Sequence, residues 1–129
     1  MDSLVKLHVQ NSAGTIILNR PNKKNALSRA MLAELRQALD DLHRERRVRA
    51  VILTHAGDLF CAGMDLKEML ETSKQEHAQA QWHADAVQYR DLLETMLRFP
   101  KPLICGLSGP ALAGGVGSCD RSRPAIKAS

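Results

Sequence analysis

The sequence feature that most constrains the fold is a pair of short apolar runs, AVILT at 50–54 and LICGL at 103–107, each followed by a glycine-containing bend. Apolar runs of this length, bounded by turn residues, are typical of strands buried in a sheet. The first bend, CAGMD at 61–65, leads into a segment of helical spacing, and the second, ALAGGVG at 111–117, should open a helix as well. Because parallel strands are joined by long, usually helical crossovers, this order predicts a partly parallel sheet.

The N-terminal part of the chain predicts a β-hairpin followed by a helix. LVKLHV at 4–9 alternates apolar and polar residues after its first leucine, NSAG is a turn cluster, and TIILN at 15–19 is a second β-rich run. Ser28 is the predicted N-cap of the next helix. The apolar residues of this helix recur at helical spacing and are predicted to face the core: Met31, Leu32, Leu35, Ala38, Leu39 and Leu42.

Two further helices are predicted between the apolar runs. Asp65 is expected to cap a helix that begins at Leu66, with Glu68 as its capping-box partner. A longer helical pattern runs from about residue 75 to residue 99, where FPKP ends it because proline cannot continue a helix. No internal repeat or linker divides the chain before residue 117, so a single α/β domain is predicted.

The two bends offer backbone chemistry rather than reactive side chains. The N-terminus of a helix presents free N–H groups and a partial positive potential. Two such N–H groups aimed at one point form an oxyanion hole, and glycine lets a ligand approach the backbone closely. For either bend taken alone, a tight turn without further function is the alternative.

The net charge of +4 derives from two basic runs, at 43–49 and 121–127. Neither run is interleaved with aromatic residues, so a solvated helix end and a tail are predicted, and no nucleic-acid partner. No apolar run approaches the ~20 residues of a membrane span. The N-terminus carries no targeting pattern, so a leader is left to a longer form of the chain.

The three cysteines at 61, 105 and 119 form no CxxC pair, which fits a reducing compartment. The histidines are scattered, and no metal site is predicted. A catalytic cysteine stays as an alternative, although neither Cys61 nor Cys105 has a basic partner nearby in the sequence.

Three segments taken together resemble the crotonase superfamily, also called the enoyl-CoA hydratase/isomerase family. They are LNRPNKKNALS at 18–28, VILTHAGDLFCAGMDLKEM at 51–69 and KPLICGLSGPALAGGVG at 101–117, in the family's order. The resemblance implies that residues 1–117 form the N-terminal part of a crotonase-like ββα spiral fold, incomplete at its C-terminus. Residues 118–129 depart from the family pattern and are interpreted as a basic, truncated or alternative tail.

The resemblance also implies an acyl-CoA thioester ligand, with coenzyme A as part of the substrate and no other cofactor. The backbone N–H groups of Met64 and Gly114 match the family's oxyanion hole. A basic loop at Lys23 and Lys24 suits a polyanionic ligand, with a solvated loop as the alternative. The residues that match the family's CoA-contacting positions are Lys24, Asn25, Ala26, Leu27, Ala62, Asp65, Leu66 and Lys67.

The sequence departs from the family at the hydration chemistry. Family hydratases use two glutamates; Gly117 stands at the position of the first, and the second belongs to a segment past residue 129. We therefore expect a protein of fatty-acid metabolism that binds acyl-CoA without hydratase activity. An active acyl-CoA enzyme, and a truncated product that is unstable or associates with full-length homologues, are the alternatives.

The family resemblance implies a mitochondrial location, with a cytoplasmic one as the alternative. It also implies homo-oligomers, trimers or multiples of them, although the family's usual contact segments lie beyond this chain.

Overall fold

The structure is a computed structural model that describes residues 3–57, 61, 63–107 and 125–127. Its centre is a five-stranded sheet in the order β1-β2-β3-β4-β5. The strand β1 pairs antiparallel with β2, and the remaining neighbours are parallel, which confirms the predicted partly parallel α/β fold. The strands are β1 Val5–Gln10, β2 Ala13–Leu18, β3 Ala50–His55, β4 Leu103–Leu107 and β5 Ala125–Lys127.

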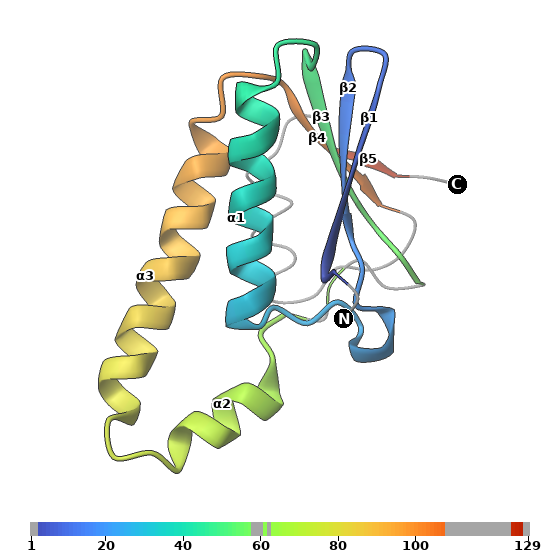
Figure 1. Cartoon of the computed structure of the whole chain (residues 1–129). Coiled ribbons are helices and arrows are strands. Elements are labelled where there is room, and N and C mark those ends of the chain that lie inside the picture. The colour runs from blue at the N-terminus through green and yellow to red at the C-terminus, as the bar shows by residue number, and fades with distance from the viewer. Residues whose placement is uncertain (1–2, 58–60, 62, 108–124, 128–129) are drawn as a thin grey trace.

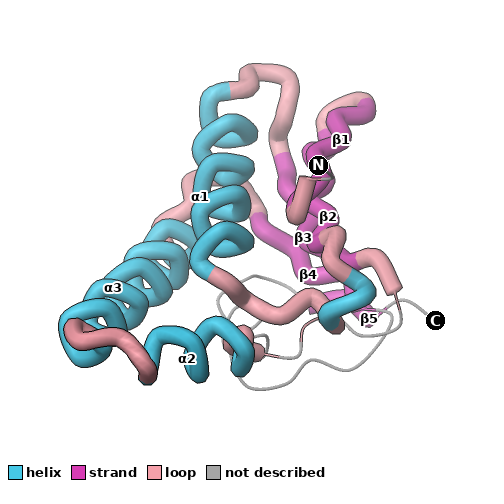
Figure 2. Tube along the Cα trace, turned by 60° about the horizontal axis from the view of Figure 1, so that its bottom comes forward, coloured by secondary structure: helices cyan, strands magenta, loops and turns pink. Residues whose placement is uncertain are grey.

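Two long helices lie on the same side of the sheet, one next to it and the other beyond the first, as Figure 1 shows. These are α1, Arg29–Arg44, and α3, Ala78–Leu97. The short helix α2, Leu66–Ser73, lies beyond the N-terminal end of α1. It is next to the loop that contains the 3-10 turn η1, Pro21–Lys23 (Figure 2). This end of the molecule is the one at which the parallel strands finish (Figure 1), and ligands of open α/β sheets bind there.

The core lies between the sheet and α1. Side chains along β2 and β3 alternate between buried and half-buried, so one face of each strand is sealed and the other is partly covered. All six apolar positions that the sequence assigned to the core face of α1 are buried. Gly14 on β2 faces this helix closely, because an added Cβ would lie 2.8 Å from a methyl carbon of Leu42.

The hairpin is confirmed, with a tighter turn than the sequence indicated. Gln10 pairs with Ala13, so only Asn11 and Ser12 form the connection. Asn11 has a positive φ of 56°, a conformation that asparagine adopts more readily than most residues. The strand β2 therefore begins at Ala13 rather than at residue 15.

Both predicted N-caps are present, but the capping box predicted for Asp65 and Glu68 is wrong. The Ser28 side chain accepts a hydrogen bond from the Met31 N–H at 3.1 Å, and the Asp65 side chain accepts one from the Glu68 N–H at 3.1 Å. Glu68 does not reach back to the cap as a capping box requires. Its carboxylate instead accepts from the Arg29 N–H at 2.9 Å, while the Asp65 N–H donates to the Leu27 carbonyl.

The long helix is confirmed as α3, but its apolar face is only partly buried. Leu92 and Met96 are in the core, whereas Trp82 and Leu97 are 43% and 52% exposed. The strand β5 lies within the segment 118–129, where no element was predicted. The helix predicted after the second glycine bend falls outside the described residues. No helix in the described ranges combines the length and hydropathy that a membrane span requires.

Candidate functional site

The loop between β2 and α1 is held in shape by Asn25. This residue follows Lys24 in the left-handed conformation, with φ values of 53° and 55°. The Asn25 side chain is fully buried; its oxygen accepts from the Arg20 N–H at 2.7 Å, and its amide donates to the Ala56 carbonyl at 2.9 Å. A single side chain thus closes the loop and ties it to the end of β3.

The same loop pairs with the first glycine bend through an isolated parallel bridge between Leu27 and Met64. The Leu27 N–H donates to the Gly63 carbonyl at 2.7 Å, and the Asp65 N–H donates to the Leu27 carbonyl at 3.1 Å. In a parallel bridge of this kind the middle residue directs its own N–H and C=O to the opposite side. The Met64 N–H therefore points away from the 20–28 loop.

Cys61 supports the bend from inside the protein. Its buried thiol donates to the Asn25 carbonyl at 3.1 Å and accepts from the Gly63 N–H at 3.4 Å. Burial raises the pKa of the Cys61 thiol, opposed by the hydrogen bond from Gly63. A protonated, buried thiol is a poor nucleophile, so the geometry gives Cys61 a structural role and disfavours the catalytic-cysteine alternative.

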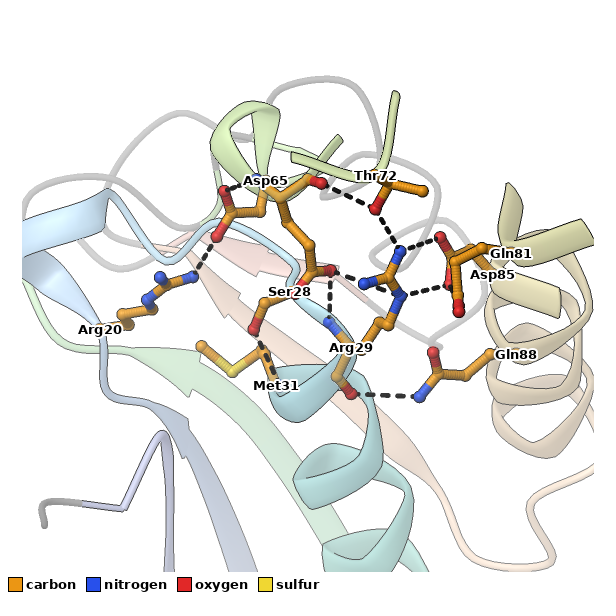
Figure 3. Close-up of polar contacts among 10 residues, drawn as sticks. Arg20, Ser28, Arg29, Met31, Asp65, Thr72, Gln81, Asp85 and Gln88 are labelled. Carbon is orange, nitrogen blue, oxygen red and sulfur yellow. Dashed lines mark hydrogen bonds and ion pairs between the residues drawn. The ribbon is translucent and has the colours of Figure 1, made fainter. Parts of the chain in front are cut away.

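An ion pair connects the two walls of the site. Arg20 Nη1 lies 2.8 Å from Asp65 Oδ2, and both side chains are largely buried (Figure 3). Burial raises the pKa of Asp65, but the hydrogen bond and charge of Arg20 and the N–H groups of Glu68 and Lys67 outweigh it, so that the pKa lies below its usual value. Asp65 is thus ionised at neutral pH and occupied as a cap and an ion-pair partner.

A pocket of about 530 Å³ opens between the 20–28 loop and α2. Its wall combines apolar side chains with two lysines and the paired Asp65. The lining residues are Lys23, Ala26, Met64, Asp65, Leu66, Lys67 and Met69. Volume and lining fit a ligand that has an apolar part and negative charge.

The structure brings together six of the residues that the sequence singled out. This one pocket is lined by Lys23, Ala26, Met64, Asp65, Leu66 and Lys67. Asn25 and Leu27 are buried and support the loop, and Lys24 is exposed beside it. Ala62, Gly114 and Gly117 lie outside the described residues. That any of these residues contacts CoA stays a prediction.

The sequence analysis missed Met69. Its signal was present in the sequence, because Met69 follows Leu66 by three residues and such pairs share one face of a helix. In the described parts of the chain, no group of three or more histidine, cysteine or acidic side chains is placed to hold a metal ion.

Comparison with known proteins gives a consistent result. The sequence model of the enoyl-CoA hydratase/isomerase family matches residues 8–119. A putative enoyl-CoA hydratase of Thermus thermophilus is 40% identical over 111 residues, which cover 81% of this chain and 42% of that protein. The human mitochondrial Delta(3,5)-Delta(2,4)-dienoyl-CoA isomerase is 33% identical over 116 residues, which cover 85% of this chain and 33% of that protein.

Solved structures agree. The crystal structure of an enoyl-CoA hydratase/isomerase from Xanthobacter autotrophicus Py2 superposes with a TM-score of 0.89 and 30% sequence identity, over 98% of this chain and 46% of that one. The present chain therefore spans less than half of the length of each of these three proteins.

Proposed function

The chain belongs to the enoyl-CoA hydratase/isomerase family, and we propose from that membership that the pocket between the 20–28 loop and α2 binds acyl thioesters of coenzyme A. The observation that carries the proposal is the Leu27–Met64 bridge, which turns the Met64 N–H away from the loop at a residue that lines the pocket. A fixed backbone N–H beside apolar side chains is a donor that stabilises a thioester oxygen as it gains negative charge.

The charges around the pocket suit a polyanion. Lys23 and Lys67 line it, and Lys24 is exposed in the same loop. The negative charge of Asp65, the carboxylate among the lining residues, is balanced by Arg20 at 2.8 Å. The lysines are thus left to attract the phosphates of CoA, while Ala26, Met64, Leu66 and Met69 offer apolar surface to the remainder of the ligand.

Two further contacts come from the family resemblance. We propose that the Gly114 N–H is the second donor of the oxyanion hole and that Ala62 lies along the thioester, with the buried Asn25 and Leu27 as the support of the loop. Fatty-acid metabolism is the corresponding setting.

Hydration of an enoyl group is a separate question, and we propose that this chain does not perform it. Water addition needs a group that can give and accept a proton near neutral pH. Gly117 has no side chain, and Asp65 keeps a low pKa in its ion pair with Arg20. The backbone donor alone would stabilise charge on the thioester without moving a proton.

Calorimetry with octanoyl-CoA and free CoA tests the binding proposal. Met64→Pro removes the N–H and should weaken octanoyl-CoA binding by up to about tenfold, the worth of one hydrogen bond to the thioester carbonyl. Met64→Ala keeps the N–H and is the matched control. Equal affinities of these two variants would contradict the role of the backbone donor.

The lysines are tested by charge reversal. Lys67→Glu should weaken the binding of both octanoyl-CoA and free CoA, and the difference from wild type should shrink as salt is added. Lys6→Glu, on the exposed side of β1, is the control for net charge. A loss of affinity that is equal in the two variants would remove the site-specific role of Lys67.

Turnover of crotonyl-CoA tests the hydration proposal. We expect no hydration above the rate in buffer. Hydration by the wild-type chain that disappears in Met64→Pro would overturn the proposal and support an active acyl-CoA enzyme.

A mitochondrial location and self-association are proposed from the resemblance alone. Within the family, the motifs resemble most the mitochondrial enoyl-CoA hydratase domain-containing protein 3. Cell fractionation tests the location, and light scattering of the purified chain tests whether it forms trimers or their multiples; a cytoplasmic, monomeric chain would contradict both.

A further inference from the structure

The helix α2 is attached to the protein in an unusual way. Its apolar side chains point outward: Leu66, Met69 and Leu70 are 72%, 44% and 65% exposed. The buried residue of α2 is Thr72, which is polar. A surface helix normally packs its apolar stripe on the core and exposes its polar face, so α2 is inverted and needs polar contacts to stay in place.

Arg29, the first residue of α1, makes those contacts. Its backbone N–H donates to the Glu68 carboxylate at 2.9 Å, and its Nη2 donates to the Thr72 hydroxyl at 2.8 Å. Glu68 and Thr72 are four residues apart and therefore lie on one face of α2. Arg29 thus bonds to α2 at two successive turns, through its backbone at Glu68 and through its side chain at Thr72.

The Arg29 side chain is itself fixed by α3. Its Nε and Nη2 atoms donate to the two carboxylate oxygens of Asp85 at 2.6 and 2.8 Å, a bidentate pair (Figure 3). Gln81 donates to Asp85 at 2.8 Å, and Gln88 donates to the Arg29 carbonyl at 3.1 Å. The helix α3 therefore holds this guanidinium in the orientation that α2 requires.

A second attachment of α2 is at its beginning, where Asp65 caps the helix and pairs with Arg20. Without the Arg29 side chain the helix would keep this anchor and the backbone bond to Glu68. It would lose the bond at Thr72 and the ion pair between Arg29 Nε and Glu68 at 4.0 Å. Met69, which lies between those two residues, would then move relative to the loop that forms the opposite wall of the pocket.

From these contacts we infer that Arg29 is a positioning residue for the pocket: it sets the position of α2, and thereby of Leu66 and Met69, for the apolar part of the bound thioester. The inference rests on the proposed function and goes beyond it, because Arg29 is not among the residues that line the pocket. The inference predicts a smaller effect on the CoA part of the ligand than on the acyl part, since one of the two lysines that line the pocket, Lys23, lies in the 20–28 loop and not on α2.

The experiment compares four variants of the full chain. Arg29→Gln removes the bidentate pair and the bond to Thr72. Thr72→Val removes the hydroxyl that accepts from Arg29 at nearly constant volume, and Thr72→Ser, which keeps that hydroxyl, is its control. Arg36→Gln breaks an exposed ion pair on the same helix, between Arg36 and Asp40 at 3.5 Å, and is the control for Arg29.

Two measurements are made on each variant. Hydrogen–deuterium exchange of residues 66–73 without ligand reports the hold on α2, and calorimetry reports the affinities for octanoyl-CoA and free CoA. Arg29→Gln should speed the exchange of α2 and weaken octanoyl-CoA binding by about tenfold, with a smaller loss for free CoA. Thr72→Val should shift both quantities in the same direction and by less, whereas Thr72→Ser and Arg36→Gln should match the wild type.

Unchanged exchange of α2 in Arg29→Gln would contradict the inference that the Arg29 side chain holds α2 in place. Faster exchange with an unchanged ratio of octanoyl-CoA to free CoA affinity would overturn the positioning role. A wild-type chain that binds neither compound would remove the proposed function and the positioning role together, so the two failures are distinguishable. If Arg29→Gln does not fold, the comparison of Thr72→Val with Thr72→Ser decides the matter by the same two measurements.

Discussion

At position 25 a single side chain fixes the shape of the 20–28 loop. Asn25 adopts a left-handed backbone conformation and fills both ends of its amide with backbone partners, Arg20 and Ala56. The motif NKKNAL therefore has a structural role, because the residue at its centre has no exposed surface.

We expect Asn25→Ala to lower the free energy of unfolding by about 2–4 kcal/mol, since it leaves the partly buried Arg20 N–H and Ala56 carbonyl without their partner and keeps an unfavourable positive φ. Urea denaturation measures the change. Asn22→Ala, at an exposed position of the same loop, should stay within about 0.5 kcal/mol of the wild type. A similar effect of the two substitutions would refute the role of Asn25.

At the same scale, the sequence alone could locate most of the pocket residues, but not which residues of the loop are buried and which are exposed. Ala26, Met64 and Lys67 fall in motifs, and the resemblance placed them at one ligand. That Asn25 is buried while its neighbour Lys24 is exposed depends on the left-handed turn at these two residues, which no periodic pattern encodes.

At the scale of elements, the packing of α1 on the sheet depends on the absence of a side chain at Gly14. An added Cβ would come within 2.8–3.0 Å of the two methyl carbons of Leu42, closer than such contacts allow. Gly106 on β4 offers the contrast, because an added Cβ there meets its nearest neighbours at 3.7–3.8 Å.

We therefore expect Gly14→Ala to destabilise the protein by about 1–3 kcal/mol through overpacking, as measured by thermal or urea unfolding. Gly106→Ala should be neutral or stabilising by up to about 1 kcal/mol, because alanine loses less backbone entropy on folding. Combining Gly14→Ala with Leu42→Ala should cost less than the sum of the two single changes, since the deleted methyl groups are the ones that clash. Strict additivity would contradict this account.

The pair of Arg29 and Asp85 joins α1 to α3 and makes their association sensitive to acid. The hydrogen bond from Arg29 is the main reason that the pKa of Asp85 lies below its ordinary value; burial opposes this shift and the hydrogen bond from Gln81 adds to it. A carboxylate whose pKa is lower in the folded than in the unfolded protein stabilises the fold above its unfolded pKa, and this stabilisation is lost as the pH falls through the folded pKa.

Asp85→Asn should accordingly lower the stability by about 1–2 kcal/mol at pH 7. The gap between the two proteins should narrow as the pH falls below about 4, the ordinary carboxyl range. Thermal unfolding between pH 7 and pH 3 measures both effects. A gap that stays constant over this range would show that Asp85 contributes through packing rather than charge.

The elements also show where local sequence patterns mislead. Glu68 stands three residues after a cap and fits the capping-box pattern, but its carboxylate serves the N–H of Arg29, thirty-nine positions away in sequence. The apolar spacing of α3 predicted a helix correctly, yet Trp82 and Leu97 remain exposed, because periodicity identifies a face and not the partner that covers it.

At the scale of the whole molecule, the buried residues form one continuous cluster that includes β2, β3, α1 and the second half of α3. The order of strands and crossovers could be predicted from the sequence, because the apolar runs and the intervening helical segments are local signals. The place of β5 beside β4 could not, since its three residues lie in a polar, basic segment without apolar alternation.

A continuous core predicts one cooperative unfolding transition. The far-UV signal follows all helices, whereas fluorescence follows Trp82 near the beginning of α3, where that helix has little core contact. We expect the two urea transitions to coincide, because Leu92, Met96 and the bonds of Asp85 couple α3 to α1. Fluorescence that changes at clearly lower urea would show that α3 separates from the core first.

The arrangement of β1, β2, α1 and β3 has a consequence for the order of events during synthesis. The hairpin pairs neighbouring residues, and the parallel partner of β2 ends at His55, so three strands and the helix that covers them are complete once residue 55 has left the ribosome. Local contacts form fastest, and nascent chains organise from the N-terminus. The 20–28 loop and Arg29 belong to this early unit, whereas α2 and Asp85 of α3, which fixes the Arg29 side chain, emerge later. One wall of the pocket is thus in place before the other has been translated.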